Sequence, residues 1–383
     1  MPKMRLSLPS SLLLLAIASL PVAADTSLTE GLNKVFESVI DADGPGCNVG
    51  VLSNGEWAHK QGYGLANLEL GVPLDGTQLH RMGSVSKQFT AAAVLLLADE
   101  GKIDLSADIH RYLPDLPDYA APVTINAMLG HVAGMGDYDL ISGSYEGPIA
   151  DNAIDLKSVA GGPFRMGNED YLTIEEFYDV VAQVPLAQPP EQAFLYSNLA
   201  YFLLSMLVEE VSGESLREYA QRRMFEPLGM RSTFFSDDPF EIVKNRAYGY
   251  KTLESGARVN DMTNLFWVGD GGLHTSLDDM RRWDRQFYEP VLGRNPSVFL
   301  EHMNTANSSL SARGDRYANG QFVSTYQGQQ IFSHSGGWLG TLTYYGRIPE
   351  LSTSLMMMCN DATIDLGALI EAALPLLVRS GDK

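Results

Sequence analysis

Cysteine and basic residues are scarce in this 383-residue chain. It contains 2 cysteines, and 27 Lys and Arg residues stand against 47 Asp and Glu, which gives a formal net charge of −20. So few cysteines exclude a disulfide-rich scaffold, and the acidic excess disfavours nucleic acid as a partner because it repels phosphate. No Cys or His pair has metal-ligand spacing. We therefore expect no bound metal and no cofactor.

Hydrophobic runs long enough to cross a membrane are also missing. The N-terminal run Leu12–Leu20 covers 9 residues, whereas a spanning helix needs about 20. Lys3 and Arg5 precede this run and the small residues Val22–Ala24 follow it, which is the pattern of a cleavable signal peptide. We expect residues 1–24 to be removed on export, leaving a periplasmic or secreted protein without a stable membrane anchor.

Strand patterns lie at the two ends of the remaining chain and helical patterns in the middle. Two short strand-like runs, Cys47–Ser53 and Glu56–Gln61, are joined by Asn54-Gly55, a strong hairpin signal. Strand-like runs return late in the chain at Gln321–Tyr326, Gln330–Ser333, Leu342–Ile348 and Ser352–Cys359. Helical spacing is found at Thr26–Ile40, Gln88–Gly101, Ile174–Val184, Ala200–Val211 and Gly367–Val378.

This distribution predicts an α/β protein of the α+β type, with one antiparallel sheet of five or more strands built from both chain ends and flanked by helices. We expect a single domain over residues 25–383. Its α/β part would cover about 25–85 and 316–383, and a mainly helical insertion about 86–315. The sequence predicts no particular oligomeric state.

A candidate nucleophile lies at the start of the most apolar helical window. Ser84-Val85-Ser86-Lys87 opens Gln88–Gly101, which is apolar on nearly every face and must be buried. Lys87 follows Ser84 by one turn, and residues three apart share a helix face. A serine nucleophile needs a base or electrostatic partner in this position. By itself, however, this motif is better explained as a helix cap.

Two further polar clusters follow in the chain. Tyr196-Ser197-Asn198 precedes the helical window at Ala200–Val211, where Ser or Asn could cap the helix. His334-Ser335-Gly336-Gly337 follows a strand-like run, and its glycines could form a plain turn. No G-x-S-x-G occurs in the chain, which disfavours a catalytic triad on a nucleophile elbow.

The order of these three clusters resembles the serine β-lactamase and penicillin-binding protein superfamily, on its class C-like branch with D-peptidases and esterases. The resemblance extends over nearly the whole chain after the signal peptide. Further stretches that carry it are Gly62–Asn67, Gly83–Thr90, Tyr112–Pro114, Met128–Gly134, Pro227–Met230 and Gly271–Leu273.

The resemblance implies catalysis through an acyl-enzyme. Ser84 would attack a carbonyl carbon while Lys87 and Tyr196 share its proton, and the backbone N–H groups of Ser84 and Gly337 would form the oxyanion hole. The residues expected to bind substrate are Asn198, His334, Ser335 and Gly336, with Asn198 holding either the substrate amide or Lys87. A tyrosine base requires a pKa below its usual ~10, and burial can equally lower the pKa of Lys87, so the sequence leaves both open as the base.

The implied function is an exported serine hydrolase that cleaves a small amide or ester, either a D-amino-acid peptide or a carboxylic ester, supplied as a small molecule or short peptide. A β-lactamase, or a penicillin-binding protein that is acylated without efficient turnover, remains an alternative. His334 stands where drug-hydrolysing class C enzymes have Lys. Because imidazole titrates near neutrality, its attraction for a β-lactam carboxylate should be weaker. The other histidines, including His131, are interpreted as structural.

The two cysteines, Cys47 and Cys359, lie near opposite ends of the chain. Export permits a disulfide, and two buried thiols are an equally good reading of the residues. In relatives of the resembled family, the first and last strands are antiparallel neighbours. This arrangement implies that Cys47 and Cys359 approach each other.

Overall fold

The computed structural model describes residues 26–137, 172–238, 240–262 and 268–381. The predicted signal peptide lies outside these residues. So do the segments 138–171 and 263–267.

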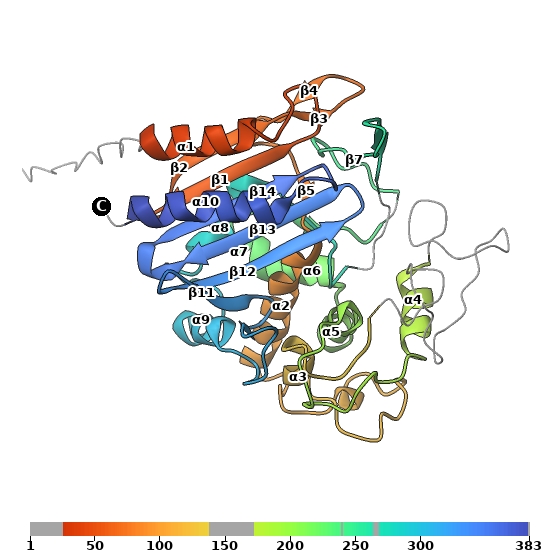
Figure 1. Ribbon diagram of the computed structural model, residues 1–383. Helices are drawn as coiled ribbons and strands as arrows, with labels where there is room; N and C mark the ends of the chain where they lie inside the picture. The colour runs from red at the N-terminus through yellow and green to blue at the C-terminus, as the bar shows by residue number, and fades with distance from the viewer. Residues whose placement is uncertain (1–25, 138–171, 239, 263–267, 382–383) are drawn as a thin grey trace, which may run out of the picture.

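A seven-stranded antiparallel sheet forms the centre of the described structure (Figure 1). In spatial order its strands are β10 (Arg316–Tyr317), β11 (Phe322–Tyr326), β12 (Gln329–Trp338), β13 (Thr341–Ile348), β14 (Thr353–Cys359), β1 (Cys47–Ser53) and β2 (Glu56–Tyr63). Strands β1 and β2 come from the start of the chain and the other five from its end. The predicted fold class, an antiparallel sheet built from both ends, is therefore confirmed.

The two chain ends join through the pairing of β1 with β14. Cys47 lies directly opposite Cys359, with Cα atoms 3.9 Å apart, and their sulfur atoms form a disulfide. On the other side of β1, the predicted hairpin leads into β2. Asn54 and Gly55 both adopt positive φ, 51° and 76°, as the two central residues of a tight hairpin turn require.

Strand β14 is buried on both faces, which explains its continuous apolar sequence. Leu355 and Met357 pack with the helices α1 (Thr26–Glu37) and α10 (Leu366–Gly381). Figure 1 shows these two helices side by side in front of the sheet. Met356 and Met358 face the opposite core, so alternate residues of one strand connect two hydrophobic layers.

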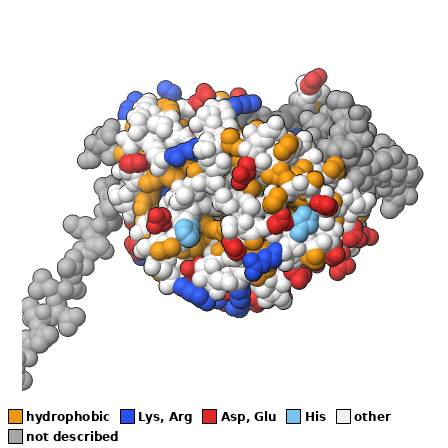
Figure 2. Space-filling view, turned by 90° about the horizontal axis from the view of Figure 1, so that it is seen from below, with side chains coloured by type: hydrophobic (Ala, Val, Ile, Leu, Met, Phe, Trp, Pro, Cys, Tyr) orange, Lys and Arg blue, Asp and Glu red, His pale blue; other side chains and the backbone are white. Residues whose placement is uncertain are grey.

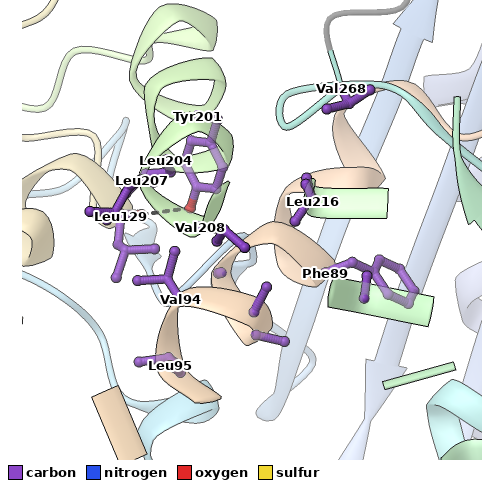
Figure 3. Packing of buried hydrophobic residues seen from close by; sticks show 14 of the residues in the cluster. Phe89, Val94, Leu95, Leu129, Tyr201, Leu204, Leu207, Val208, Leu216 and Val268 are labelled. Carbon is purple, nitrogen blue, oxygen red and sulfur yellow. Dashed lines mark hydrogen bonds between the residues drawn. The ribbon is translucent and has the colours of Figure 1, made fainter. Parts of the chain in front are cut away.

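The second layer contains the remaining helices and short helical turns. They are η1 (Gly83–Ser86), α2 (Lys87–Asp99), η2 (Ile109–Arg111), α3 (Ile125–Leu129), α4 (Ile174–Val181), α5 (Asn198–Ser212), α6 (Leu216–Ala220), η4 (Gln221–Phe225), α7 (Glu226–Leu228), α8 (Leu277–Arg285) and α9 (Pro296–Asn304). The turn η5 (Pro349–Leu351) lies between β13 and β14 in sequence, and its Leu351 packs against the cluster that contains Leu374 and Val378 of α10. Helix α2 is buried over nearly its whole length, as its sequence predicts, and packs against α5. Figure 3 shows side chains of both helices meeting in this core.

Short strands complete the described chain. They are β3 (Leu65–Asn67), β4 (Val72–Pro73), β5 (His80–Arg81), β6 (Phe234–Phe235), β7 (Tyr250–Thr252), β8 (Arg258–Asn260) and β9 (Leu273–Thr275). The face seen in Figure 2 carries acidic side chains interspersed with basic and apolar ones. Within the described ranges, no helix combines the length and apolarity that a membrane crossing requires.

Candidate active site

The first site element is the turn that carries Ser84. Ser84 lies in η1, a 3₁₀ turn that continues into α2 at Lys87. Residues three apart eclipse each other in a 3₁₀ turn, so the Lys87 side chain comes directly over Ser84. The Lys87 Nζ atom lies 3.0 Å from Ser84 Oγ. Ser84 is half-buried, whereas Lys87 is completely buried.

The second element supplies the other contacts of Lys87. Its ammonium donates to Asn198 Oδ1 at 2.6 Å and to the backbone carbonyl oxygen of Asp270 at 2.7 Å. Asn198 is the first residue of α5, and Ser197 before it caps the helix by accepting from the Ala200 N–H. The sequence proposed this cap, and the structure shows it. Asn198 thus contacts Lys87, one of the two roles that the resemblance implied.

The third element is the C-terminal part of β12, which extends beyond the residues that pair with β11. β11 pairs with β12 only as far as Ser333, so η1 packs against the edge beyond it. A Cβ added at Gly83 would lie 2.8 Å from the Gly337 nitrogen, and one at Gly336 would lie 3.0 Å from the Ser84 nitrogen. The two backbone N–H groups predicted to form the oxyanion hole therefore belong to adjoining segments.

The expected strand Gln330–Ser333 is too short, because β12 continues through Trp338. Neither Gly336 nor Gly337 has a positive φ, so these glycines do not form a turn. Glycine is required at position 336, because a Cβ there would lie 2.1 Å from the Met82 carbonyl oxygen and 3.0 Å from the Ser84 nitrogen. Ser335 and Gly337 are exposed along this strand, while His334 and Gly336 are buried.

Comparison with known proteins agrees with this geometry. The family model described as Beta-lactamase matches residues 32–375. The chain belongs to the Beta-lactamase family. This result confirms the resemblance to the serine β-lactamase and penicillin-binding protein superfamily seen in the three motifs.

Individual relatives are distant. The chain is 27% identical over 336 residues to a D-aminopeptidase of Gluconobacter oxydans, covering 86% of this chain and 59% of that protein. Thus it spans well under two thirds of this relative's length. An octameric penicillin-binding protein homologue from Pyrococcus abyssi has a TM-score of 0.74 at 24% identity, covering 92% of this chain and 77% of the other. A D-amino acid amidase from Ochrobactrum anthropi SV3, complexed with L-phenylalanine, has a TM-score of 0.71 at 21% identity, covering 92% and 99%. These two structures support the fold.

Burial tunes the charge of Lys87. Desolvation lowers the pKa of its ammonium to about 8, although the carboxylates of Asp270 and Asp137 act in the opposite direction. A buried ammonium loses its hydration shell, and this favours the neutral amine. A substantial fraction of Lys87 is therefore neutral slightly above physiological pH. It can then accept a proton from Ser84.

Burial has the opposite consequence for Tyr196. It raises the pKa of the phenol well above 10, and a side-chain hydrogen bond with Ser84 offsets only part of this increase. A tyrosine base in the free protein requires a lowered pKa, so this environment does not favour that assignment. Lys87 Nζ lies 5.0 Å from the centre of the Tyr196 ring. Of the two candidate bases that the sequence left open, only Lys87 has its pKa shifted towards neutrality.

His334 differs from its expected behaviour. Desolvation and the nearby Lys87 ammonium lower its pKa to about 3, so it does not titrate near neutrality. Its Nδ1 lies 2.5 Å from the Ser335 carbonyl oxygen, and its Nε2 lies 3.0 Å from the Tyr317 hydroxyl. Because a carbonyl oxygen can only accept, the proton is on Nδ1 and Nε2 accepts from Tyr317. His334 is a neutral structural partner of this strand.

Two acidic residues near Lys87 were not predicted from the sequence. Asp137 accepts hydrogen bonds from Asn198, and Asp270 supplies a backbone oxygen to Lys87. A backbone acceptor leaves no side-chain pattern, and Asp137 lies 61 residues before Asn198. His131, interpreted as structural, accepts from the Ser197 N–H through Nδ1. In the described part of the chain, no group of three or more His, Cys, Asp or Glu residues could hold a metal ion.

Proposed function

We propose that this protein hydrolyses a small amide or ester through an acyl-enzyme on Ser84. The observation that carries the proposal is the 3.0 Å contact between Lys87 Nζ and Ser84 Oγ, together with the lowered pKa of Lys87, about 8. A general base with a pKa near the working pH transfers protons efficiently. Lys87 therefore takes the hydroxyl proton as Ser84 Oγ attacks the substrate carbonyl carbon.

The other residues complete acylation. The backbone N–H groups of Ser84 and Gly337 stabilise the negative charge on the carbonyl oxygen, and losing one such donor typically costs about 2.7–4 kcal/mol of barrier. Tyr196, kept protonated by burial, donates its proton to the leaving nitrogen or oxygen. The acyl group is then bonded to Ser84 Oγ, with a phenolate at Tyr196 and an ammonium at Lys87.

Deacylation reverses these proton transfers. The Tyr196 phenolate accepts a proton from water, the resulting hydroxide attacks the acyl carbon, and Lys87 returns its proton to Ser84 Oγ. Each residue regains its starting state, so one water is consumed per turnover. His334 takes no part, because one ring nitrogen is used by Ser335 and the other by Tyr317.

The charges of the site favour substrates without a carboxylate beside the scissile bond. The sequence places imidazole at position 334, and its low pKa keeps it neutral. The charged groups that act on Lys87 are the carboxylates of Asp137 and Asp270, and like charges repel a substrate carboxylate. Together with the likeness to a D-aminopeptidase, this supports D-amino-acid amides and simple esters over β-lactams. We place the enzyme in the periplasm or outside the cell, on the basis of the N-terminal signal pattern.

A substrate panel tests this proposal. D-alanine amide, D-alanyl-D-alanine, p-nitrophenyl acetate and a chromogenic cephalosporin would be compared in the wild type and in Ser84→Ala. We expect turnover of the amide and the ester to disappear in Ser84→Ala, and wild-type rates on the two carboxylate-bearing substrates to be lower. Ser86→Ala, in the same turn, should still form the acyl adduct seen by intact-protein mass spectrometry.

Two outcomes would contradict the proposal. If Ser84→Ala keeps full turnover, Ser84 is not the nucleophile. If the wild type accumulates a stable adduct with the cephalosporin and turns over none of the panel, the protein is a penicillin-binding protein that is acylated without turnover.

A further inference from the structure

The carboxylate of Asp137 holds the amide of Asn198 on the side opposite Lys87. Asn198 Nδ2 donates to both carboxylate oxygens of Asp137, at 3.1 and 3.0 Å, and the Asn198 backbone nitrogen lies 3.3 Å from one of them. A carboxylate can only accept hydrogen bonds, so it binds the NH₂ end of the amide. The oxygen end of Asn198 is thereby directed towards Lys87.

This orientation is what the Lys87 ammonium needs. Lys87 Nζ donates to Asn198 Oδ1 at 2.6 Å. If the Asn198 amide turned over, its NH₂ group would face another donor, and the contact would be lost. An asparagine alone has little preference between the two orientations, because its oxygen and nitrogen ends have the same shape. The carboxylate of Asp137 fixes the orientation, because it accepts hydrogen bonds from the NH₂ end of the Asn198 amide.

Asp137 is itself held in place by the chain around it. Ser197 Oγ donates to the carbonyl oxygen of Gly136 at 2.7 Å, and the Ser197 N–H donates to His131 Nδ1 at 3.1 Å. The Leu195 N–H donates to the His131 carbonyl oxygen at 2.8 Å. The segment from His131 to Asp137 therefore fixes the position of the Tyr196-Ser197-Asn198 motif through these hydrogen bonds. Asp137 is the last residue of this segment to contact the motif.

We propose that Asp137 is a positioning residue of the active site: it fixes the Asn198 amide so that Lys87 Nζ stays against Ser84 Oγ. This inference rests on the proposed function, in which Ser84 is the nucleophile and Lys87 its base. Asp137 acts through Asn198, and its negative charge also favours the ammonium form of Lys87.

The charged groups around Lys87 determine whether its pKa rises or falls when Asp137 is replaced. The groups around the Lys87 ammonium are the carboxylates of Asp137 and Asp270, the neutral imidazoles of His131 and His334, and the rings of Tyr196 and Tyr201. Removing the Asp137 charge takes away one of the two carboxylates that favour the ammonium, so the pKa of Lys87 falls. The reactive, neutral amine then forms at lower pH, although it is less well oriented.

The test measures the nucleophilicity of Ser84 directly, with a fluorophosphonate probe that labels activated serines regardless of natural substrate. Labelling rates would be followed from pH 5.5 to 9.5 for the wild type, Asp137→Asn and Asp137→Ala. We expect the maximal rate to fall on the order of 10–100-fold in Asp137→Ala because of lost orientation, and less in Asp137→Asn. The midpoint of the pH profile should move to lower pH by roughly one unit in both variants.

Two controls separate positioning from stability. Asp108→Asn removes another partly buried carboxylate, one that accepts from the N–H groups of His110 and Val123 away from the site. It should leave the pH profile unchanged in folded protein. In a double-mutant cycle, Asp137→Ala should add little to Asn198→Ala, because residues that act through one contact are non-additive.

The outcomes distinguish this inference from the proposed function. If the wild type is not labelled, or Ser84→Ala is labelled equally fast, the proposed function fails. If the wild type is labelled on Ser84 but the folded Asp137→Asn variant keeps both the rate and the pH midpoint of the wild type, only the role of Asp137 fails. Additive effects of Asp137→Ala and Asn198→Ala would also overturn it.

Discussion

A Cβ atom at Gly336 would lie 2.1 Å from the carbonyl oxygen of Met82. The same carbonyl accepts a hydrogen bond from Thr343 Oγ1 at 2.6 Å, so it has little freedom to move. This contact brings the backbone of β12 against the turn that carries Ser84. Glycine is therefore needed at position 336 so that the segment His334–Gly337 can pack against the turn that carries Ser84.

Gly336→Ala is expected to separate β12 from η1 and to lower kcat/KM for p-nitrophenyl acetate on the order of 100-fold, the typical consequence of a displacement near 1 Å. Gly337→Ala provides the comparison. A Cβ there would meet the Leu342 side chain at 3.2 Å, and the backbone N–H is retained, so we expect a much smaller loss. Equal losses in the two variants would contradict this account of Gly336.

The pH dependence of ester hydrolysis should report Lys87. Its pKa is lowered to about 8, mainly by desolvation. The neutral amine is the base, so kcat/KM should rise tenfold per pH unit below 8 and level off above it. After subtraction of uncatalysed hydrolysis, a rising limb centred near 6.5 would instead indicate a histidine.

Lys87→Arg tests the same assignment without removing the positive charge. A guanidinium does not lose its proton at any accessible pH, so it cannot act as the base. We expect a loss of about 10²–10⁴-fold in kcat/KM, the usual contribution of general-base catalysis. The rise in kcat/KM towards pH 8 should disappear with it. A variant that retained the wild-type profile would exclude Lys87 as the base.

The sheet could be predicted from the sequence because its signals are local. The run Leu355–Met358 is apolar at every position, and the structure indeed buries β14 between two cores. The end of β12 was predicted wrongly because Gly336 and Gly337 lower strand propensity. Gly336 has to be glycine because the turn that carries Ser84, a segment some 250 residues away in sequence, approaches it closely. Such long-range contacts leave no periodic pattern.

The site was predictable only in part for the same reason. The spacing of Ser84 and Lys87 places them on one face, and the 3.0 Å contact follows from it. The neutral state of His334 follows from burial and from the nearby Lys87 ammonium, which lies far away in sequence. The sequence shows that an imidazole is present, but the desolvation that lowers its pKa arises only in the folded protein.

The disulfide between Cys47 and Cys359 should contribute strongly to stability. It links residues 312 positions apart in sequence, and cross-links that close long loops restrict the unfolded chain most. We expect Cys47→Ala/Cys359→Ala to lose about 2–5 kcal/mol of unfolding free energy in urea titrations. Adding reductant should destabilise the wild type but not the double variant. Two reactive thiols in unreduced, unfolded wild type would show that the bridge does not form.

Stability should decline as the pH falls from 6.5 towards 4, because several histidines are buried in the neutral form. Desolvation is the main cause of their lowered pKa values: about 4 for His59, about 3 for His80 and His334, and well below 6.5 for His131 and His274. In this window the unfolded chain binds protons that the folded protein does not. Each such histidine therefore costs about 1.4 kcal/mol per pH unit below its unfolded pKa. His110, whose pKa is raised, acts in the opposite direction.

Urea unfolding at pH 7.5, 6.0 and 5.0 would measure this slope. His80→Gln removes a titrating group that is 1% exposed, so the slope should decrease by about one histidine, or about 1.4 kcal/mol per pH unit, even if the variant is less stable overall. His302→Gln changes an exposed histidine and serves as the control, with the wild-type slope expected. An unfolding free energy that is constant from pH 7.5 to 5.0 would mean that these histidines become charged without unfolding the protein.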